Sequence, residues 1–169
     1  MKYSENWKHW VAHIDERTCR ECRERRGKVY ATDEEVKPYP PLHPRCRCEI
    51  KLLPSAEAGT LTPDKTAGVD WFVKYLHELP DNYLTAEDAK REGWKPQKGN
   101  LAEMLPGYKI FGGVYENRNG HLPQTEGRIW YEADLSYSGG YRNRERLVFS
   151  NDGLVFATYD HYETFTEII

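Results

Sequence analysis

The cysteines and the aromatic residues of this 169-residue chain lie in different parts of it, and this separation constrains the fold most. All four cysteines precede residue 49, whereas most aromatic residues and glycines follow residue 68. A chain of this length forms one ordinary domain or two small ones, and the separation favours two. We expect a cysteine-rich module over residues 1–52, a proline-, serine- and threonine-containing linker over residues 53–66, and a larger domain over residues 67–169.

The cysteines form two closely spaced pairs, Cys19-x-x-Cys22 and Cys46-x-Cys48. A structural zinc ion needs four ligands in a tetrahedron, and a turn with the C-x-x-C spacing supplies two of them. His43 is an alternative ligand, which would leave Cys48 unused. The other interpretations are two disulfides, which need an oxidising compartment, or four free thiols. We expect zinc, because it would stabilise a module too small to fold on an apolar core alone.

Hydrophobic spacing predicts helices first and strands last. Apolar residues three and four apart in residues 3–15 predict the end of an amphipathic helix. Further helices are expected over residues 67–78, capped by the threonine before them, and over residues 85–91. From residue 108 onward, short apolar segments alternate with turns, including the hairpin turn at residues 151–153. The fold class expected is α+β, with N-terminal helices packed on a twisted antiparallel sheet.

The segment from residue 130 to residue 165 carries a complete acid-base set for cutting RNA. Glu132 is the candidate base, His161 the candidate acid, and Arg142 and Arg146 the candidate phosphate ligands. Cleavage through the 2′-OH needs a base for that proton, an acid for the leaving oxygen and fixed cations for the added charge, but no metal. Each residue taken alone also fits a structural or solvated side chain, so the complete set carries the prediction.

A series of motifs between Gly68 and Thr166 follows the order found in one protein family. The motifs are Leu79-Pro80-Asp81-Asn82-Tyr83, Gly93-Trp94, Lys98-Gly99-Asn100-Leu101-Ala102, Asn117-Arg118, Gly127-Arg128, Trp130, Glu132-Ala133-Asp134, Arg142-Asn143, Arg146 and Asp160-His161-Tyr162. In these motifs the chain resembles the barnase family of small bacterial ribonucleases. The resemblance implies an endoribonuclease that cleaves single-stranded RNA by transesterification through a 2′,3′-cyclic phosphate, without a cofactor.

The resemblance also implies a role for each matched residue. Glu132 corresponds to the general base and His161 to the general acid. Arg142 and Arg146 correspond to the arginines that bind phosphate. Asp134 corresponds to a buried acid that pairs with these arginines and fixes their direction.

Base recognition is implied for a loop that contains Tyr115, Asn117, Arg118 and Asn119, and Tyr162 corresponds to the residue that flanks the substrate beside the acid. The family has a base-binding glutamate where this chain has Asn119. Because asparagine is neutral and also carries donors, we expect a purine preference with weaker discrimination of guanine from adenine.

A second departure concerns Ala86, which stands where the family has a lysine that stabilises the transition state. Losing such a cation costs about 10²–10³ in rate if nothing replaces it. Residues 64–169 are also acidic, with 12 basic and 17 acidic side chains, although RNA is a polyanion. The alternative is therefore a non-catalytic RNA-binding or capsid-associated protein, which would not need both Glu132 and His161.

The cysteine module resembles the C-terminal end of Mu-type phage head-morphogenesis (minor capsid) proteins. The residues that carry this resemblance are Trp10, Asp15, Thr18-Cys19-Arg20-Glu21-Cys22, Gly27-Lys28-Val29-Tyr30 and Pro40-Pro41-Leu42-His43-Pro44-Arg45-Cys46-Arg47-Cys48. It implies a polymorphic toxin that a barstar-like inhibitor neutralises in the producing cell.

The first residues lack the apolar core of a signal peptide, and no apolar run approaches the roughly 20 residues of a membrane span. We expect a protein made in the cytoplasm, and delivered to a target cell or packaged by a phage-like system. A piece of a longer chain fits the same observation.

Overall fold

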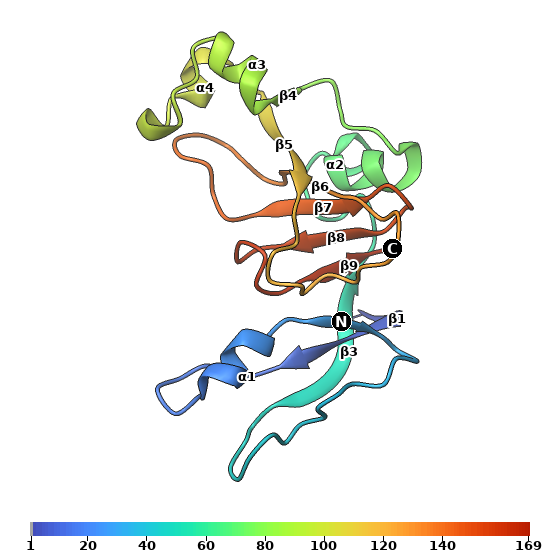
Figure 1. Ribbon diagram of the computed structural model, residues 1–169. Helices are drawn as coiled ribbons and strands as arrows, with labels where there is room; N and C mark the ends of the chain where they lie inside the picture. Colours follow the sequence, from blue (N-terminus) through green and yellow to red (C-terminus); the bar gives the residue numbers. More distant parts are fainter. Residues whose placement is uncertain (1) are drawn as a thin grey trace.

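The computed structural model describes residues 2–169 and contains one mixed sheet that runs through both parts of the chain (Figure 1). Its strands are β1 (Lys2–Val11), β2 (Val29–Ala31), β3 (Glu49–Ala56), β4 (Tyr83–Thr85), β5 (Lys109–Tyr115), β6 (Trp130–Asp134), β7 (Arg146–Ser150), β8 (Val155–Thr158) and β9 (Thr166–Ile168). They lie in the order β2-β1-β3-β9-β8-β7-β6-β5-β4. The pairs β3–β9 and β4–β5 are parallel and the other neighbours antiparallel, so the sheet is mixed where an antiparallel sheet was expected.

The helices are short and lie at separate places along the sheet (Figure 1). They are α1 (Arg20–Arg25), α2 (Val69–Trp71) with the π-helical turn η2 (Phe72–Leu76), α3 (Ala86–Arg91) and α4 (Leu101–Met104), besides the 3-10 turns η1 (Lys65–Ala67) and η3 (Pro96–Lys98). Within residues 2–169, no helix has the length and apolar character needed to cross a membrane.

The helix expected over residues 3–15 is wrong, because this segment forms β1. Trp7 packs edge-on against Phe156, whereas Trp10 is fully buried in a separate small cluster with Tyr30 and Val36. Residues three apart on a strand face opposite sides of the sheet, so two separate clusters account for a spacing that is typical of a helix. Pairing with β2 and β3 then satisfies the backbone of β1 on both sides.

The expected layer of N-terminal helices is also wrong. The helix over residues 67–78 is present only as α2 and η2, and its N-cap is Gly68 instead of the expected threonine. Val69 and Val73 of this helix pack against Leu147 and Ile168 on the central sheet. In contrast, α3 and α4 pack around Ile110 beside β4 and β5, at the far end.

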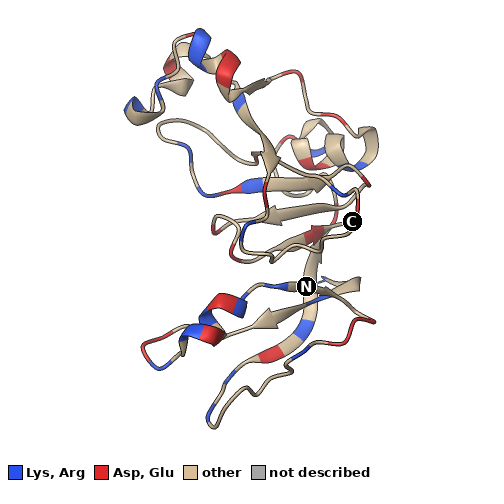
Figure 2. Cartoon of the chain, viewed as in Figure 1, with Lys and Arg blue, Asp and Glu red and all other residues tan. Residues whose placement is uncertain are grey.

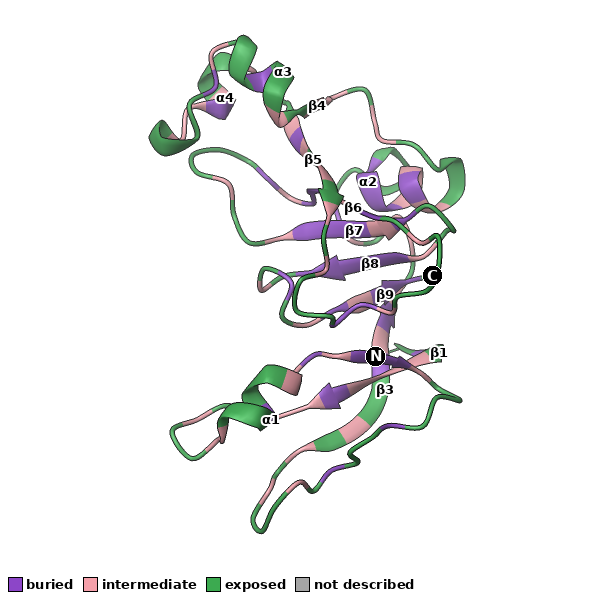
Figure 3. Cartoon of the chain, in the orientation of Figure 1, coloured by how far each residue is buried: buried purple, intermediate pink, exposed green. Residues whose placement is uncertain are grey.

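The two parts of the chain share a hydrophobic core. Val29 and Leu53 of the first part pack in one cluster with Trp130, Val148 and Phe156 of the second. The central strands β7 and β8 are almost entirely buried (Figure 3). The first residues of the expected linker, 53–56, belong to β3, so the sheet itself connects the two parts.

Candidate active site and candidate metal centre

Asp134 organises the arginines of the candidate active site. It is fully buried at the end of β6, where its Oδ2 accepts a hydrogen bond from the backbone N of Ile110 at 2.9 Å. Its Oδ1 accepts hydrogen bonds from Nε and Nη2 of Arg142 at 3.0 and 2.8 Å. Arg146, the first residue of β7, lies opposite Asp134 in the sheet, with its Nη1 3.5 Å from the same oxygen. Figure 2 shows acidic and basic segments next to each other at the start of β7.

The two guanidinium groups are therefore held close together on one carboxylate. Arg146 is buried, and its Nη1 also donates to the backbone oxygens of Asn143 at 2.6 Å and Glu145 at 2.8 Å. Burial, and then the charge of Arg142, lower the pKa of Arg146. One carboxylate cannot neutralise two guanidinium groups, so the pair retains positive charge that a phosphate could complement.

Glu132 lies two residues before Asp134 on the same face of β6. One of its carboxylate oxygens accepts a hydrogen bond from the hydroxyl of Tyr162. Gly112 leaves room for this carboxylate, because a Cβ there would lie 2.2 Å from Oε1 of Glu132. Burial raises the pKa of Glu132, and the charges of Arg146 and Arg142 oppose that rise.

His161 lies in a tight turn after β8, with left-handed backbone at His161 (φ 57°) and Tyr162 (φ 72°). Asp160 holds this turn, since its Oδ1 accepts hydrogen bonds from Oγ1 of Thr158 at 3.0 Å and from N of Thr164 at 2.9 Å. Such backbone persists in non-glycine residues only where the surroundings enforce it, and it concentrates at functional sites. The threonines are supporting residues that the sequence analysis missed, although a threonine four residues after Asp160 was a usable signal.

The surroundings of His161 disfavour its protonated form in the free protein. Burial, followed by the charges of Arg146, Arg144 and Arg142, lowers the pKa of His161. A nearby carboxylate or phosphate would favour the charged form. The arginines act in the opposite direction in the free protein, so a bound phosphate would be needed to offset them.

Two adjoining clefts meet at His161. The first, of about 370 Å³, is lined by Val114, Tyr115, Glu116, Asn117, Arg118, Asn119, Glu132, His161 and Tyr162. The second, of about 410 Å³, is lined by Arg142, Asn143, Arg144, Arg146, Asp160, His161 and Glu163. Glu132 and residues 115–119, which we call the recognition loop, thus line one cleft, and the arginines line the other. His161 lies between the two clefts.

Asn117 and Asn119 shape the recognition loop through their side chains. Asn117, which has left-handed backbone, donates from Nδ2 to the backbone oxygen of Leu122 at 2.9 Å and accepts from its N at 3.1 Å. Asn119 donates to the backbone oxygen of Tyr162 at 3.0 Å and accepts from N of His121 at 3.0 Å. Both amide atoms of Asn119 therefore already have partners within the protein.

The remaining predicted residues of the loop lie on the walls of the first cleft. The ring of Tyr115 stacks on that of Tyr162, with centroids 4.4 Å apart. Arg118 is exposed and pairs with Glu116 at 2.6 Å. Ala86 begins α3 and packs against the cluster beside β4 and β5, so it brings no cation.

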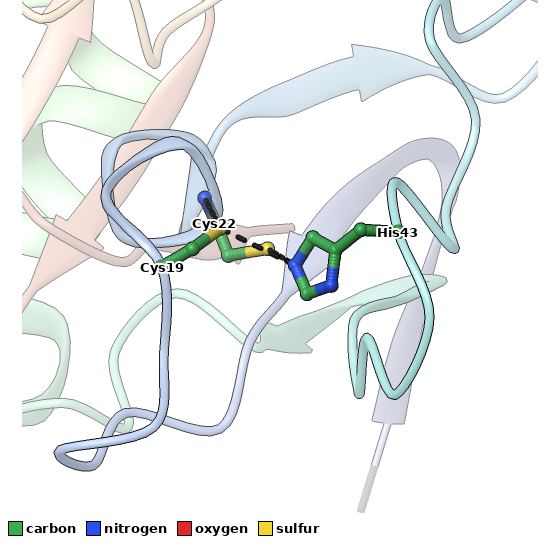
Figure 4. Close-up of side chains that lie close together, drawn as sticks. All are labelled: Cys19, Cys22 and His43. Atoms are coloured by element: carbon green, nitrogen blue, oxygen red, sulfur yellow. Dashed lines mark hydrogen bonds between the residues drawn. The ribbon is translucent and has the colours of Figure 1, made fainter.

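The cysteine module places a cluster of sulfur and imidazole donors between α1 and the loop before β3. Nε2 of His43 lies 3.3 Å from Sγ of Cys19 and 3.5 Å from Sγ of Cys22 (Figure 4). Sγ of Cys22 lies 3.8 Å from that of Cys46, and Cys48 is close to both. All four cysteines are free thiols, and the cluster could hold a metal ion.

Two family profiles match different parts of the chain. The profile of the ribonuclease family matches residues 72–169, and that of phage Mu protein F like protein matches residues 1–51. Among solved structures, ribonuclease Sa2 with guanosine-2′-cyclophosphate is 26% identical; the match covers 52% of this chain and 94% of that one, with a TM-score of 0.33.

Curated relatives are considerably more similar. A ribonuclease of Bacillus pumilus is 52% identical over 133 residues, which cover 71% of this chain and 82% of the relative. A ribonuclease of Heyndrickxia coagulans is 50% identical over 99 residues, which cover 59% of this chain and 90% of the relative. These matches confirm the resemblance inferred from the motifs: the chain belongs to the barnase-type ribonuclease family.

Proposed function

We propose that this protein is an endoribonuclease that cleaves single-stranded RNA by metal-independent transesterification. The observation that carries the proposal is the position of His161 at the junction of the cleft containing Glu132 and the cleft containing Arg142 and Arg146. A phosphodiester bound there would have Glu132 on one side and His161 beside it. The two arginines would contact its oxygens. This geometry is what an in-line displacement at phosphorus requires.

In the proposed reaction, Glu132 takes the proton of the 2′-OH, and the 2′ oxygen forms a bond to phosphorus. The bond from phosphorus to the 5′ oxygen breaks, and His161 donates its proton to that oxygen. Arg142 and Arg146 stabilise the added charge on the phosphoryl oxygens. Hydrolysis of the 2′,3′-cyclic phosphate then reverses the proton transfers, with His161 accepting a proton from water.

The protonation states required are a charged carboxylate and a charged imidazole. The arginines support the first, because their charges oppose the burial that raises the pKa of Glu132. They hinder the second, because the same charges lower the pKa of His161. Substrate phosphate resolves this conflict, since its negative charge lies between the arginines and the imidazole and restores the proton of His161.

We further propose that the first cleft takes a purine. The stacked rings of Tyr115 and Tyr162 support this, because they form an aromatic surface at the recognition loop. Asn119 uses both amide atoms on Tyr162 and His121, so it acts mainly by holding the loop. Weaker discrimination of guanine from adenine follows.

The biological role that fits best is that of a toxin domain. Its support is the match of residues 1–51 to phage Mu protein F like protein, in front of a nuclease. A nuclease of this kind endangers the cell that makes it. A barstar-like inhibitor as partner, and delivery or packaging by a phage-like system, are parts of the same proposal.

The test is cleavage of a labelled RNA by the purified full chain in the presence of a chelator. Glu132→Ala and His161→Ala should each lower the rate by about 10² or more. Glu126→Ala, which removes an exposed carboxylate, is the matched control and should cleave normally. Products should carry 2′,3′-cyclic phosphate ends. Tight RNA binding without cleavage would support the non-catalytic alternative and overturn the enzyme proposal.

A further inference from the structure

We propose that Cys19, Cys22, His43 and Cys46 bind a zinc ion, and that this ion holds α1 against the turn that carries His161. Zinc binding by the cysteine module is separate from ribonuclease activity and can be tested without RNA.

Three of the distances between the proposed donor atoms fit a single small ion, and Cys46 joins the set through its contact with Cys22. Zn–S bonds of about 2.3 Å and tetrahedral angles place two sulfur ligands about 3.8 Å apart, and a sulfur and an imidazole nitrogen slightly closer. Sγ of Cys22 lies 3.8 Å from Sγ of Cys46 and 3.5 Å from Nε2 of His43. Sγ of Cys19 lies 3.3 Å from the same nitrogen. Disulfide-bonded sulfurs would lie much closer, at about 2.05 Å.

The imidazole of His43 is oriented for this role. Its Nδ1 lies 2.9 Å from the backbone oxygen of Pro44, so this nitrogen carries the proton and donates. Nε2 is then left unprotonated and directed at the two sulfurs of Cys19 and Cys22. A backbone carbonyl that fixes the tautomer of a ligating histidine is a common outer-shell feature of zinc sites.

Cys46 and Cys48 both lie within 4.8 Å of Cys22, and we assign the fourth ligand to Cys46. Cys46 and His43 lie on one tight loop, in which N of Cys46 donates to the backbone oxygen of His43 at 3.1 Å. Cys48 instead packs against the apolar cluster around Trp10 and Tyr30. This arrangement includes His43 as a ligand, which the sequence analysis treated only as an alternative.

The other end of α1 contacts the ribonuclease part of the chain. Nε2 of His121 lies 2.9 Å from the backbone oxygen of Glu24, in the last turn of α1. Nη1 of Arg26 pairs with Glu163 at 3.2 Å. Gly27 has positive φ and packs so closely that a Cβ there would lie 1.7 Å from the backbone oxygen of Glu163.

These contacts connect the metal cluster to the active site. Glu163 is two residues from His161 in the same turn, and the backbone N of His121 donates a hydrogen bond to Oδ1 of Asn119 in the recognition loop. A helix of 6 residues has little stability of its own. An ion bound to Cys19 and Cys22 would fix its N-terminal end, and thereby the position of its C-terminal end on both loops.

The first experiment measures zinc in the purified full chain and in single variants. The unmodified chain and Cys48→Ser should contain about one zinc ion per chain, whereas Cys46→Ser and His43→Ala should lose most of it. Cobalt(II) replacing zinc should give the visible spectrum of a tetrahedral site with three sulfurs and one nitrogen. Absence of zinc, or a four-sulfur spectrum that is lost in Cys48→Ser, would overturn the ligand assignment.

The second experiment measures amide hydrogen exchange with and without a chelator. Removal of zinc should speed exchange at residues 119–121 and 160–164, while residues 86–91, at the far end of the sheet, should be unaffected. Unchanged exchange in both loops after complete loss of zinc would show that the ion serves the cysteine module alone.

Discussion

The active site and the cysteine cluster lie in the same sheet-based molecule, yet they are organised differently. Glu132, Asp134 and Arg146 project from central strands whose backbone is buried and paired on both sides. The sulfur and imidazole donors come from a short helix and a loop. The part of the active site that lies on central strands is formed by folding itself, whereas the cysteine cluster depends on the ligand that would join its helix and loop.

The largest expected effect separates the two sites in one experiment. His161→Ala should lower RNA cleavage by about 10² or more and retain its zinc. Cys22→Ser should lose zinc but keep cleavage within about tenfold, because it alters positioning without removing a reacting group. Rates and zinc content would be measured on the same preparations. Equal losses of cleavage in both variants would contradict the distinction between the sites.

A large gain is expected from Ala86→Lys. A cation at this position restores a charge that the family uses in the transition state, and the cleavage rate should rise at least about tenfold. The matched control is Gln97→Lys, which adds the same charge at an exposed position. Similar gains in both variants would show that general attraction of RNA, and not a local contact, is responsible.

Some residues of the two sites could be predicted from the sequence and others could not, depending on whether they lie in a specific motif. The candidate acid, the candidate base and the arginines could be singled out because each lies inside a short motif whose order is specific to one family. Thr158 was missed because a threonine that supports a turn resembles any other polar residue. The last ligand of the proposed zinc site stayed open because spacing along the chain does not show how the loop arranges His43, Cys46 and Cys48 around Cys22.

The fold was predicted less well, and for a physical reason. The spacing of Trp7 and Trp10 fits one face of a helix as well as opposite faces of a strand. Only the partner strands β2 and β3 decide between these, and they are distant in sequence. Likewise, the parallel pairing of β3 with β9 depends on contacts that no local pattern records.

Base selectivity offers a third comparison, within the active site itself. Asn119→Glu should increase discrimination of guanine over adenine by about 1–2 kcal/mol, because hydrogen bonds to a charged acceptor are stronger. The side chain introduced by Asn119→Gln has the length of glutamate but not its charge, so this variant should not increase the discrimination. Cleavage of dinucleotides that differ only in the 5′ base provides the measurement. Strong guanine selectivity in the unmodified protein, unaltered by either variant, would mean that another residue reads the base.

The pH dependence of kcat/KM should report the pKa values of Glu132 and His161. Burial raises the pKa of Glu132 and lowers that of His161. Activity needs the first group deprotonated and the second protonated, so the two shifts narrow the bell-shaped profile of kcat/KM from both sides. In the profile of kcat, bound phosphate should move the alkaline limb to higher pH. A broad plateau of kcat/KM would exclude this assignment of the two groups.

The smallest effect is expected from Arg144→Gln. The charge of Arg144 lowers the pKa of His161 but does not act appreciably on Glu132. Removing it should move only the alkaline limb of kcat/KM to higher pH and leave the acid limb in place. Movement of both limbs would indicate that the variant disturbs the whole site instead of one charge.

The pairing of β3 with β9 has a consequence for any process that separates the nuclease from the segment before it. Ser55 and Ala56 occupy the side of β9 that β8 leaves open. A protease that cut the chain after β3 would leave two fragments still associated through this pairing and through the shared core. If they did part, β9 would become an unprotected edge, able to recruit a strand from another molecule and begin aggregation. The first part of the chain thus also shields the nuclease from self-association.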